Sequence, residues 1–263
     1  MHTNAARHLP SRKLRPPMRG DLGSIALLLD VDGTIVDTAA TPGGVDVPRS
    51  LHASLEELHA KCGGALALVS GRLIRDLDGL FAPLQLPAIG AHGAEMRLPG
   101  KPIAFAQGAN LGKAFRDQVA AVAAGDPRII LEDKGSSLAV HYRLAPQLEL
   151  TLKTKLEAII ARLAVRDVEL MHGKAVIDIK LTHFSKGAAV RKLMKHPPFL
   201  NRRPVFVGDD TTDESVFALL PTLGGLGFSV GRFIPGTNGT FGAPADVRQW
   251  LASLCGGECS GCL

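Results

Sequence analysis

The sequence is short of cysteine and of long apolar segments, and these shortages exclude two classes of protein. Only four cysteines occur in 263 residues, and three of them fall in 255–263, which is too few for a disulfide framework at this length. The longest stretch without a charged residue, 215–231, contains Pro221 and four glycines, so it does not predict a membrane-spanning helix. We expect a globular protein of the reducing cytoplasm, with 255–263 as a free C-terminal tail.

Large aromatic residues are also scarce, and the excess of basic charge is confined to one end. The chain has one Trp, one Tyr and a formal net charge of +5. Residues 1–20 hold five basic residues and no acidic residue, so the 25 basic and 25 acidic residues of 21–263 balance. A segment 21–263 that is formally neutral and has few Trp or Tyr side chains to stack on bases disfavours nucleic-acid binding. We expect 1–20 to be a disordered basic tail.

Three continuous apolar runs predict strands that are buried on both faces. They are Ile25–Leu29, Ala65–Val69 and Pro204–Val207, and a helical pattern follows each of them. The helical patterns cover about 47–61, 72–81 and 212–220. Such alternation predicts an α/β fold with a doubly wound, Rossmann-like parallel sheet. Polar residues follow each strand, at the sheet edge where such folds bind their ligands.

The middle of the chain has a different pattern, in which a helix is followed by two strands and the unit then repeats. The helical stretches lie near 110–124 and 147–164. The strand-like runs are Ile129–Asp133, Ser137–Arg143, Asp167–Met171 and Lys174–Lys180. This pattern predicts an α+β module whose antiparallel sheet is covered by helices on one face. We place the module at 98–181, inserted into a core domain formed by 21–97 and 182–254.

The segment Asp30-Val31-Asp32-Gly33-Thr34 directly follows the first predicted strand and is the strongest local motif. Two carboxylates two residues apart at the carboxyl edge of a sheet can divide a reaction between them. One carboxylate can attack an electrophile while the other moves a proton. The plainer interpretation is an acidic turn that caps a helix.

A second acidic cluster follows the third predicted strand. It runs from Gly208 to Glu214 and contains Asp209, Asp210 and Asp213. Four acids within six residues repel one another unless a cation holds them, and oxygen ligands of this kind suit magnesium. The cluster therefore predicts a magnesium site, with an acidic helix N-terminus as the alternative.

Two further segments can bind an anion beside these acids. Ser70-Gly71-Arg72 offers a hydroxyl and backbone N–H groups at the start of a helix. Lys186 lies in the first turn of another predicted helix, where the helix dipole disfavours a lysine unless an anion or an acid compensates it. Together the four segments predict a nucleophile, a proton carrier, a metal site and phosphate ligands.

The order of these motifs resembles that of the haloacid-dehalogenase-like phosphatases. Other segments are similar to the trehalose-6-phosphate phosphatase family within that superfamily. They are His92-Gly93-Ala94-Glu95, His141-Tyr142-Arg143, Gly173-Lys174 and Gly208–Glu214. The resemblance covers about 24–254 and implies a hydrolase core with an inserted cap. It also implies a magnesium-dependent, cytoplasmic enzyme of trehalose biosynthesis that acts on trehalose 6-phosphate, without a nucleic-acid or membrane partner.

The resemblance implies roles for individual residues. Asp30 would attack phosphorus to give an aspartyl-phosphate, and Asp32 would protonate the departing sugar oxygen and then deprotonate the hydrolytic water. Lys186 and Ser70 would bind the transferring phosphoryl group, whose approach to an anionic nucleophile requires cations. The implied metal ligands are Asp30, the Asp32 backbone carbonyl and Asp209, with Asp213 and Asp210 in support. The implied substrate-binding residues are Ser70, Gly71, Arg72, His92, Glu95, His141, Arg143, Lys174 and Asp178.

One cap segment departs from the family. There the Lys and Glu of a Gly-Lys-x-x-x-Glu segment reach the sugar hydroxyls, whereas the segment Gly173–Asp178 of this chain ends in Asp. The departure keeps another substrate open, such as a mannosyl- or glucosyl-phosphoglycerate. A catalytically silent sensor of sugar phosphates is a further alternative, although the intact motifs argue against it.

Overall fold

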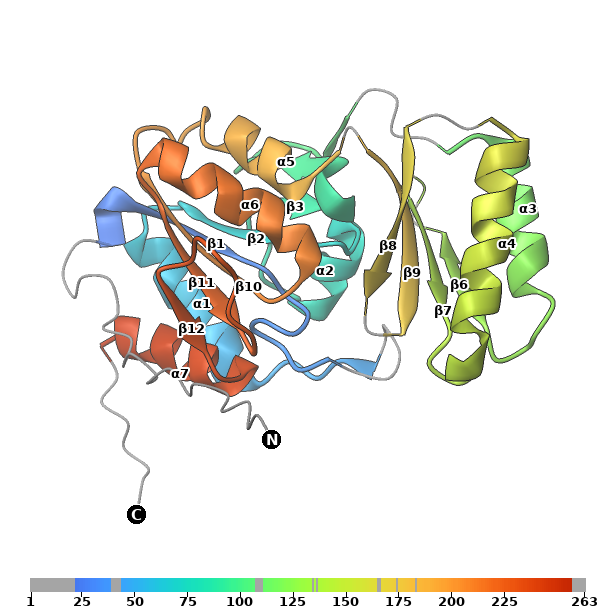
Figure 1. Ribbon diagram of the computed structural model, residues 1–263. Helices are drawn as coiled ribbons and strands as arrows, with labels where there is room; N and C mark the ends of the chain where they lie inside the picture. The colour runs from blue at the N-terminus through green and yellow to red at the C-terminus, as the bar shows by residue number, and fades with distance from the viewer. Residues whose placement is uncertain are drawn as a thin grey trace, which may run out of the picture.

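The structure is a computed structural model, and it describes residues 22–38, 44–106, 111–133, 135, 137–164, 167–173, 175–182 and 184–256. It contains two sheets, each with its own helices (Figure 1). The predicted tail 1–20 lies outside the described residues, as do 257–263 of the predicted C-terminal tail. No helix among the described residues has the length and apolar character needed to cross a bilayer.

The larger sheet has eight strands in the order β12-β11-β10-β1-β2-β3-β4-β5. At its centre, β1 (Ile25–Leu29) runs parallel to β2 (Leu66–Val69) on one side and β10 (Arg203–Gly208) on the other. All five residues of β1 are buried, which is why its sequence carries no polar residue. The other strands are β3 (Ala88–Gly90), β4 (Glu95–Arg97), β5 (Ala104–Phe105), β11 (Leu226–Val230) and β12 (Gly239–Phe241).

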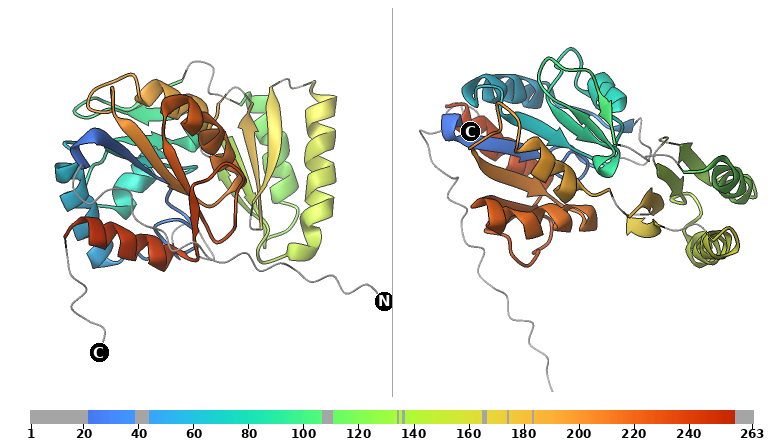
Figure 2. Two further views of the ribbon diagram at one scale, coloured as in Figure 1. Left: turned by 60° about the vertical axis from the view of Figure 1, so that its left-hand side comes forward. Right: turned by 90° about the horizontal axis from the view of Figure 1, so that it is seen from above.

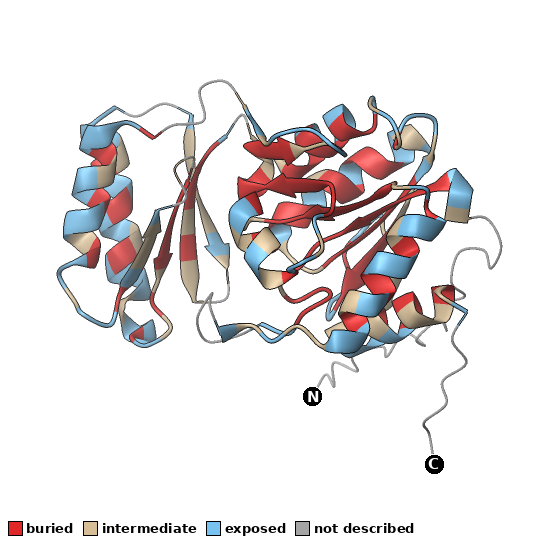
Figure 3. Ribbon diagram, turned by 180° about the vertical axis from the view of Figure 1, so that it is seen from behind, coloured by how far each residue is buried: buried red, intermediate tan, exposed pale blue. Residues whose placement is uncertain are grey.

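Helices cover both faces of this sheet, so the predicted doubly wound α/β fold is confirmed. On one face α1 (Arg49–Lys61) packs against α7 (Pro244–Leu254), and on the other α5 (Lys186–Leu193) packs against α6 (Glu214–Leu219) (Figures 1 and 2). The helix α2 (Ile74–Leu80) lies against β3 and β4. The buried strands and the inward faces of the helices form one hydrophobic core (Figure 3).

The smaller sheet is antiparallel, with the order β6-β7-β9-β8. Its strands are β6 (Ile130–Asp133), β7 (Ser137–His141), β8 (Val168–Gly173) and β9 (Val176–Leu181). Two helices, α3 (Lys113–Ala123) and α4 (Glu149–Arg162), cover the face that points away from the core domain (Figure 1). We refer to α3 through β9 as the cap. The boundary expected at 98 is too early, because β5 pairs with β4 and so belongs to the larger sheet.

The alternation of residues along the cap strands places polar side chains on the face toward the core domain. Leu138, Val140 and Ile177 pack in the cap's own hydrophobic cluster under its helices. On the opposite face, Glu132 pairs with Ala139, which in turn pairs with Asp178, and all three therefore share one row. The cap thus presents two carboxylates, those of Glu132 and Asp178, to the carboxyl edge of the larger sheet.

Leu28 lies at the centre of the larger sheet and is fully buried, whereas Leu150 at the start of α4 is 74% exposed. Replacing Leu28 with Ala leaves a cavity between the sheet and the helices that cover it. We expect Leu28→Ala to lower the free energy of unfolding by about 2–5 kcal/mol in urea titrations. Leu150→Ala is the matched control and should change it by less than about 0.5 kcal/mol. Equal effects of the two substitutions would contradict this description of the core.

Candidate active site

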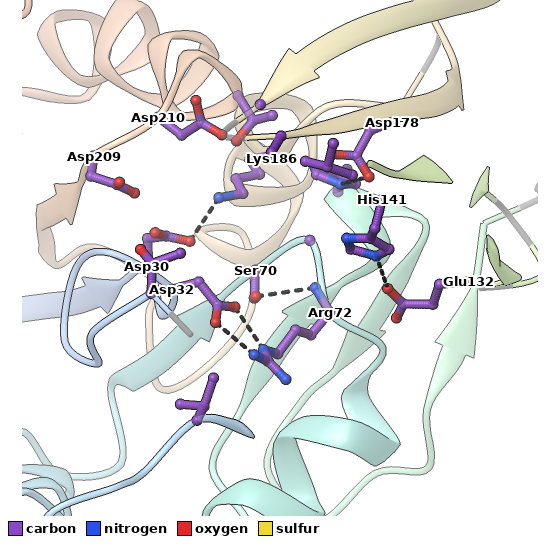
Figure 4. Close-up of a pocket in the computed structure, with 18 of the residues that line it drawn as sticks. Asp30, Asp32, Ser70, Arg72, Glu132, His141, Asp178, Lys186, Asp209 and Asp210 are labelled. Atoms are coloured by element: carbon purple, nitrogen blue, oxygen red, sulfur yellow. Dashed lines mark hydrogen bonds and ion pairs between the residues drawn. The ribbon is translucent and has the colours of Figure 1, made fainter. Parts of the chain in front are cut away.

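A cleft of about 200 Å³ lies between the carboxyl edge of the larger sheet and the polar face of the cap (Figure 4). The motifs predicted from the sequence converge on it from both sides. Those that line it are Asp30, Asp32, Ser70, Gly71, Arg72, His92, His141, Arg143, Asp178, Lys186, Asp209 and Asp210. Lys174 lies outside the described residues.

Asp30 directly follows β1 and is only 4% exposed at the floor of the cleft. Its Oδ1 accepts a hydrogen bond from Lys186 Nζ at 2.8 Å, and its Oδ2 accepts one from Thr34 Oγ1 at 2.9 Å. Burial, together with the nearby charges of Asp213 and Asp209, raises the pKa of Asp30 well above its ordinary value, although Lys186 opposes this. The site therefore carries more negative charge than its lysine balances.

Lys186 is the first residue of α5 and is 3% exposed, and its ammonium lies between two carboxylates. Nζ is 2.7 Å from Asp213 Oδ1 and 2.8 Å from Asp30 Oδ1. Burial works against the charged form, but the charges of Asp213 and Asp30 outweigh it and raise the pKa of Lys186. The two acids supply the compensation that a lysine at a helix N-terminus needs.

Asp213 is fully buried and also shapes the acidic loop after β10. Its Oδ2 accepts hydrogen bonds from the backbone N–H groups of Asp209 and Asp210, at 2.9 and 3.1 Å. Asp210 in turn accepts from the N–H of Thr211 at 2.6 Å. Part of the predicted acidic cluster is therefore a cap of the helical turn, as the plainer interpretation expected for such residues.

Asp30, Asp209 and Asp213 each offer an oxygen within 4.8 Å of the others, so this group can hold a metal ion. Three carboxylates and the single Lys186 ammonium leave two negative charges, which match a divalent cation. Hard oxygen donors of this kind suit magnesium. The carboxylates of Asp32 and Asp210 are not in the group, and the expected contribution of the Asp32 backbone carbonyl stays a prediction.

Asp32 forms a two-point ion pair with Arg72 at the mouth of the cleft (Figure 4). Arg72 Nε and Nη2 donate to the two carboxylate oxygens, each at 2.6 Å. Burial opposes the charge of Arg72, but the hydrogen bonds and charge of Asp32 outweigh it and raise the pKa of Arg72. Arg72 was predicted to bind substrate, whereas the structure pairs it with the predicted proton carrier.

Ser70 and Gly71 follow β2, and the loop that follows β3 packs directly on them. Ser70 is 1% exposed, and its Oγ accepts from the backbone N–H of Arg72 at 3.1 Å. A Cβ at Gly71 would lie 2.5 Å from the ring of His92, so a side chain at position 71 would displace His92. This close approach explains the glycine in the Ser-Gly-Arg motif.

Glu95 is not among the residues that line the cleft, and its expected contact with substrate stays a prediction. It is 7% exposed, and its Oε2 accepts from the backbone N–H of Ile74 at 2.7 Å. Burial raises the pKa of Glu95, while the hydrogen bond from Ile74 lowers it. The carboxylate accepts from an N–H at the start of α2 that has no partner within the helix. Glu95 therefore stabilises the start of α2, the helix that follows Ser70 and Arg72.

The cap contributes His141, Arg143 and Asp178 to the cleft, together with Glu132, which the sequence analysis did not select. His141 Nε2 lies 3.0 Å from Glu132 Oε2. The strand pairing places Glu132 on the same face as Asp178 with Ala139 between them, and the sequence alone does not give this pairing. Thr34, the last residue of the first motif, had no predicted role, and its hydroxyl donates a hydrogen bond to the Asp30 carboxylate.

A family model described as Trehalose-phosphatase matches residues 28–237, which include every described part of this site. The chain belongs to the trehalose-phosphatase family. It is 42% identical over 237 residues to the probable trehalose-phosphate phosphatase of Sinorhizobium fredii, covering 89% of each chain. It is 37% identical over 233 residues to the trehalose-6-phosphate phosphatase of Escherichia coli, covering 87% of this chain and 86% of that protein. The trehalose-phosphatases are phosphoric monoester hydrolases.

Solved structures share the fold of this chain. The C-terminal domain of Candida albicans trehalose-6-phosphate phosphatase matches with a TM-score of 0.76 at 22% identity, over 88% of this chain and 91% of that domain. The C-terminal domain of a Candida albicans trehalose synthase regulatory protein also matches, with a TM-score of 0.68 at 14% identity, over 88% and 94% of the two chains. A fold shared by a phosphatase and a regulatory protein does not itself determine activity, which depends on the site residues.

The raised pKa of Asp30 predicts how stability depends on pH without metal. A carboxyl whose pKa is higher in the folded state contributes stability below its ordinary pKa of 3.8 and loses it as pH rises through the folded value. In chelator at pH 7, Asp30→Asn should therefore melt a few degrees above the wild type. The difference should shrink toward pH 4, because the wild-type carboxyl then takes up its proton.

The control is Asp117→Asn, which alters an exposed carboxylate paired with Lys113 on α3 and should leave the melting temperature nearly unchanged. Differential scanning calorimetry between pH 4 and 7 measures both variants. A lower melting temperature for Asp30→Asn at pH 7 in chelator would contradict the assigned charge balance.

Proposed function

We propose that this protein is a magnesium-dependent phosphatase that hydrolyses trehalose 6-phosphate to trehalose and phosphate through an aspartyl-phosphate on Asp30. The main support is the set of charges at the cleft floor, where Asp30, Asp209, Asp213 and Lys186 lie together in a member of the trehalose-phosphatase family. The choice of substrate is supported by the names of the relatives, and the cap residues that line the cleft could surround a sugar.

In this proposal Asp30 attacks phosphorus with a carboxylate oxygen, and the bond from phosphorus to the sugar oxygen breaks. Lys186 already binds Asp30 and can contact the transferring phosphoryl oxygens without moving away from Asp213. The Ser70 hydroxyl supplies a further donor, since its oxygen already accepts from the N–H of Arg72 and its proton remains to be donated. These donors lower the repulsion between the anionic nucleophile and the phosphate dianion.

In this step Asp32 acts in its protonated form: it gives its proton to the sugar oxygen as that oxygen departs, and the resulting carboxylate then takes a proton from the water that hydrolyses the aspartyl-phosphate, which restores the acid. Its side chain is 35% exposed and borders the cleft, so it can reach the substrate. One of its oxygens must exchange Arg72 for the sugar oxygen during this step. Arg72 therefore fixes the direction in which the Asp32 carboxylate points before substrate arrives.

The charges and donor types of Asp30, Asp209 and Asp213 fit a bound magnesium ion. When bound, the ion would supply positive charge that stabilises the negative phosphoryl group in the transition state. The acidic loop places Asp209 next to Thr34, whose Oγ1 lies 3.4 Å from Asp209 Oδ1. Gly33 permits this approach, since a Cβ there would collide with the Asp209 carboxylate.

We further propose a cytoplasmic location and a role in trehalose biosynthesis. Cys62 and Cys255 are free thiols, as a reducing compartment favours. The test of the whole proposal is phosphate release from a panel that contains trehalose 6-phosphate, glucose 6-phosphate and mannosyl- and glucosyl-phosphoglycerate. Preferential hydrolysis of trehalose 6-phosphate is expected. Preference for a phosphoglycerate would overturn the substrate, and an inert protein would favour the silent sensor.

Activity should require a divalent metal. Dialysis against chelator should abolish phosphate release, and added magnesium should restore it. Asp209→Ala should behave like metal removal, because it takes one carboxylate from the group of three. The control is Glu214→Ala in the same motif, since Glu214 is half exposed, pairs with Arg232 and lies outside that group. Full activity in chelator would refute the metal assignment.

The two carboxylates of the first motif should respond differently to the leaving group. Asp30→Asn should abolish turnover of every substrate, because an amide does not form the acyl-phosphate. Asp32→Asn should lose about 10²- to 10⁴-fold on trehalose 6-phosphate and much less on p-nitrophenyl phosphate, whose leaving group needs little protonation. Steady-state kinetics with both substrates measures this, and equal losses for Asp32→Asn would argue against a proton-transfer role.

A further inference from the structure

Two lysines are buried in the described part of the chain, Lys186 at the cleft floor and Lys180 in the cap. Lys180 is 6% exposed, lies on β9 and has no part in the proposed chemistry. Its Nζ is 2.9 Å from Glu169 Oε1 on β8, and the Glu169 side chain is 42% exposed. A half-exposed ion pair offsets only part of the free energy needed to bury an ammonium, so the position of Lys180 points to a role beyond stability.

The second contact of Lys180 reaches the segment that leads from the cap back to the core domain. Its Nζ donates to the carbonyl oxygen of Phe184 at 3.4 Å. Phe184 follows β9 and directly precedes Ser185, the N-cap residue of α5. Lys180 therefore connects the cap sheet to the start of the helix that carries Lys186.

Phe184 lies at the boundary between the two domains. Its side chain packs against the hydrophobic cluster of the cap. It also packs against a small cluster of the core domain, formed by Leu73, Ala91 and Ala94. Since both domains contact the Phe184 side chain, a hydrogen bond from Lys180 to its carbonyl restrains the orientation of the cap relative to the core domain.

A second acceptor for Lys180 lies across the cap sheet. Ser137 of β7 is directly opposite Lys180. Both are on the face toward the core domain, since Leu138 and Ile179 next to them pack under the cap's helices. Ser137 is 1% exposed, and its Oγ has no hydrogen-bond partner among the described residues. Opposite residues have Cβ atoms about 5 Å apart, so the flexible Lys180 side chain can reach this hydroxyl.

In the proposed function the cap has to move in each turnover. A disaccharide phosphate passes between the cap and the core domain before it reaches Asp30, which is 4% exposed. The contact of Lys180 with Phe184 is longer than the roughly 2.9–3.0 Å that is usual for an N–H···O bond, so it breaks readily. The ion pair with Glu169 keeps the ammonium in place when it does.

We propose that Lys180 is a positioning residue that holds the cap against the core domain through the Phe184 carbonyl, and that its ammonium exchanges this acceptor for Ser137 Oγ when the cap moves away. The inference rests on the proposed function, in which the cap closes over a sugar phosphate. Because one hydrogen bond replaces another, the two arrangements stay close in free energy, as repeated opening and closing requires.

Steady-state kinetics of Lys180→Met tests this inference, since Met keeps the apolar stem and removes the ammonium. KM for trehalose 6-phosphate should rise by about 5- to 20-fold with kcat nearly unchanged, because fewer molecules have the cap in the binding arrangement. Activity on p-nitrophenyl phosphate, which has no sugar, should stay at the wild-type level. Lys180→Arg keeps the charge and the donors and should recover most of the loss.

Ser137→Ala should not weaken binding. Its hydroxyl is used only in the open arrangement, so KM for trehalose 6-phosphate should be at or below the wild-type value. Added to Lys180→Met it should have no effect, because the hydroxyl acts through the ammonium. The matched control is Lys153→Met, which alters another cap lysine, paired with Glu157 at 3.9 Å on α4, and should leave KM unchanged.

With a wild type that hydrolyses trehalose 6-phosphate, an unchanged KM for Lys180→Met would overturn the inference and leave the proposed function standing. Equal losses on p-nitrophenyl phosphate would also overturn it, because they would indicate a damaged fold or phosphoryl site. A raised KM for Ser137→Ala would overturn the exchange of acceptors. Lys180→Gln, which is shorter but polar, should raise KM in the same way and replaces Lys180→Met if that variant does not fold. A wild type inert toward every sugar phosphate would overturn the proposed function, and this inference with it.

Discussion

The ammonium of Lys186 between Asp30 and Asp213 is the contact on which the rest of the site depends. Buried carboxylates repel one another, and desolvation raises the free energy of each charge. One lysine joins the end of β1, the start of α5 and the turn after β10, three elements that are far apart in the chain. The parallel sheet makes this possible because β1 and β10 are neighbours whose carboxyl ends meet at one edge. The remaining negative charge is then available for a cation.

The strands at the centre of the sheet were predictable, and those at its edges were not. β1, β2 and β10 are buried on both faces, so their sequences are continuous apolar runs. Four of the outer strands, β3, β4, β5 and β12, have only two or three residues each, which is too short to show the alternation of apolar and polar residues expected of a strand. β11 lies in the Gly-rich segment without charged residues, and its glycines are typical of turns, so the sequence does not indicate a buried strand there. Tertiary pairing, rather than local sequence, defines these short strands.

The site residues divide in the same way. Motifs that follow a buried strand predicted Asp30, Ser70 and Asp209 near one another, because chain direction and sheet edge fix their place. The partners of Arg72 and Glu95 depend on how loops pack. Arg72 pairs with Asp32, 40 residues away, and Glu95 caps α2 from 21 residues away. Sequence spacing carries no information about such contacts, so a polar residue in a motif is easily taken for a ligand when it supports one.

The position of the cap gives a physical reason for combining two domains in one phosphatase. In the proposed function the core domain alone presents the phosphoryl-binding groups and would act on any phosphate ester that reaches them. The cap presents Glu132, His141 and Asp178 on the face of its sheet that points to this edge, while the apolar face packs against α3 and α4. Because the core domain and the cap both line the cleft, a substrate that contacts both stabilises the arrangement in which water is excluded from Asp30. In this arrangement, recognition of the sugar and protection of the proposed aspartyl-phosphate draw on the same binding energy, so selectivity appears in the rate of hydrolysis as well as in affinity.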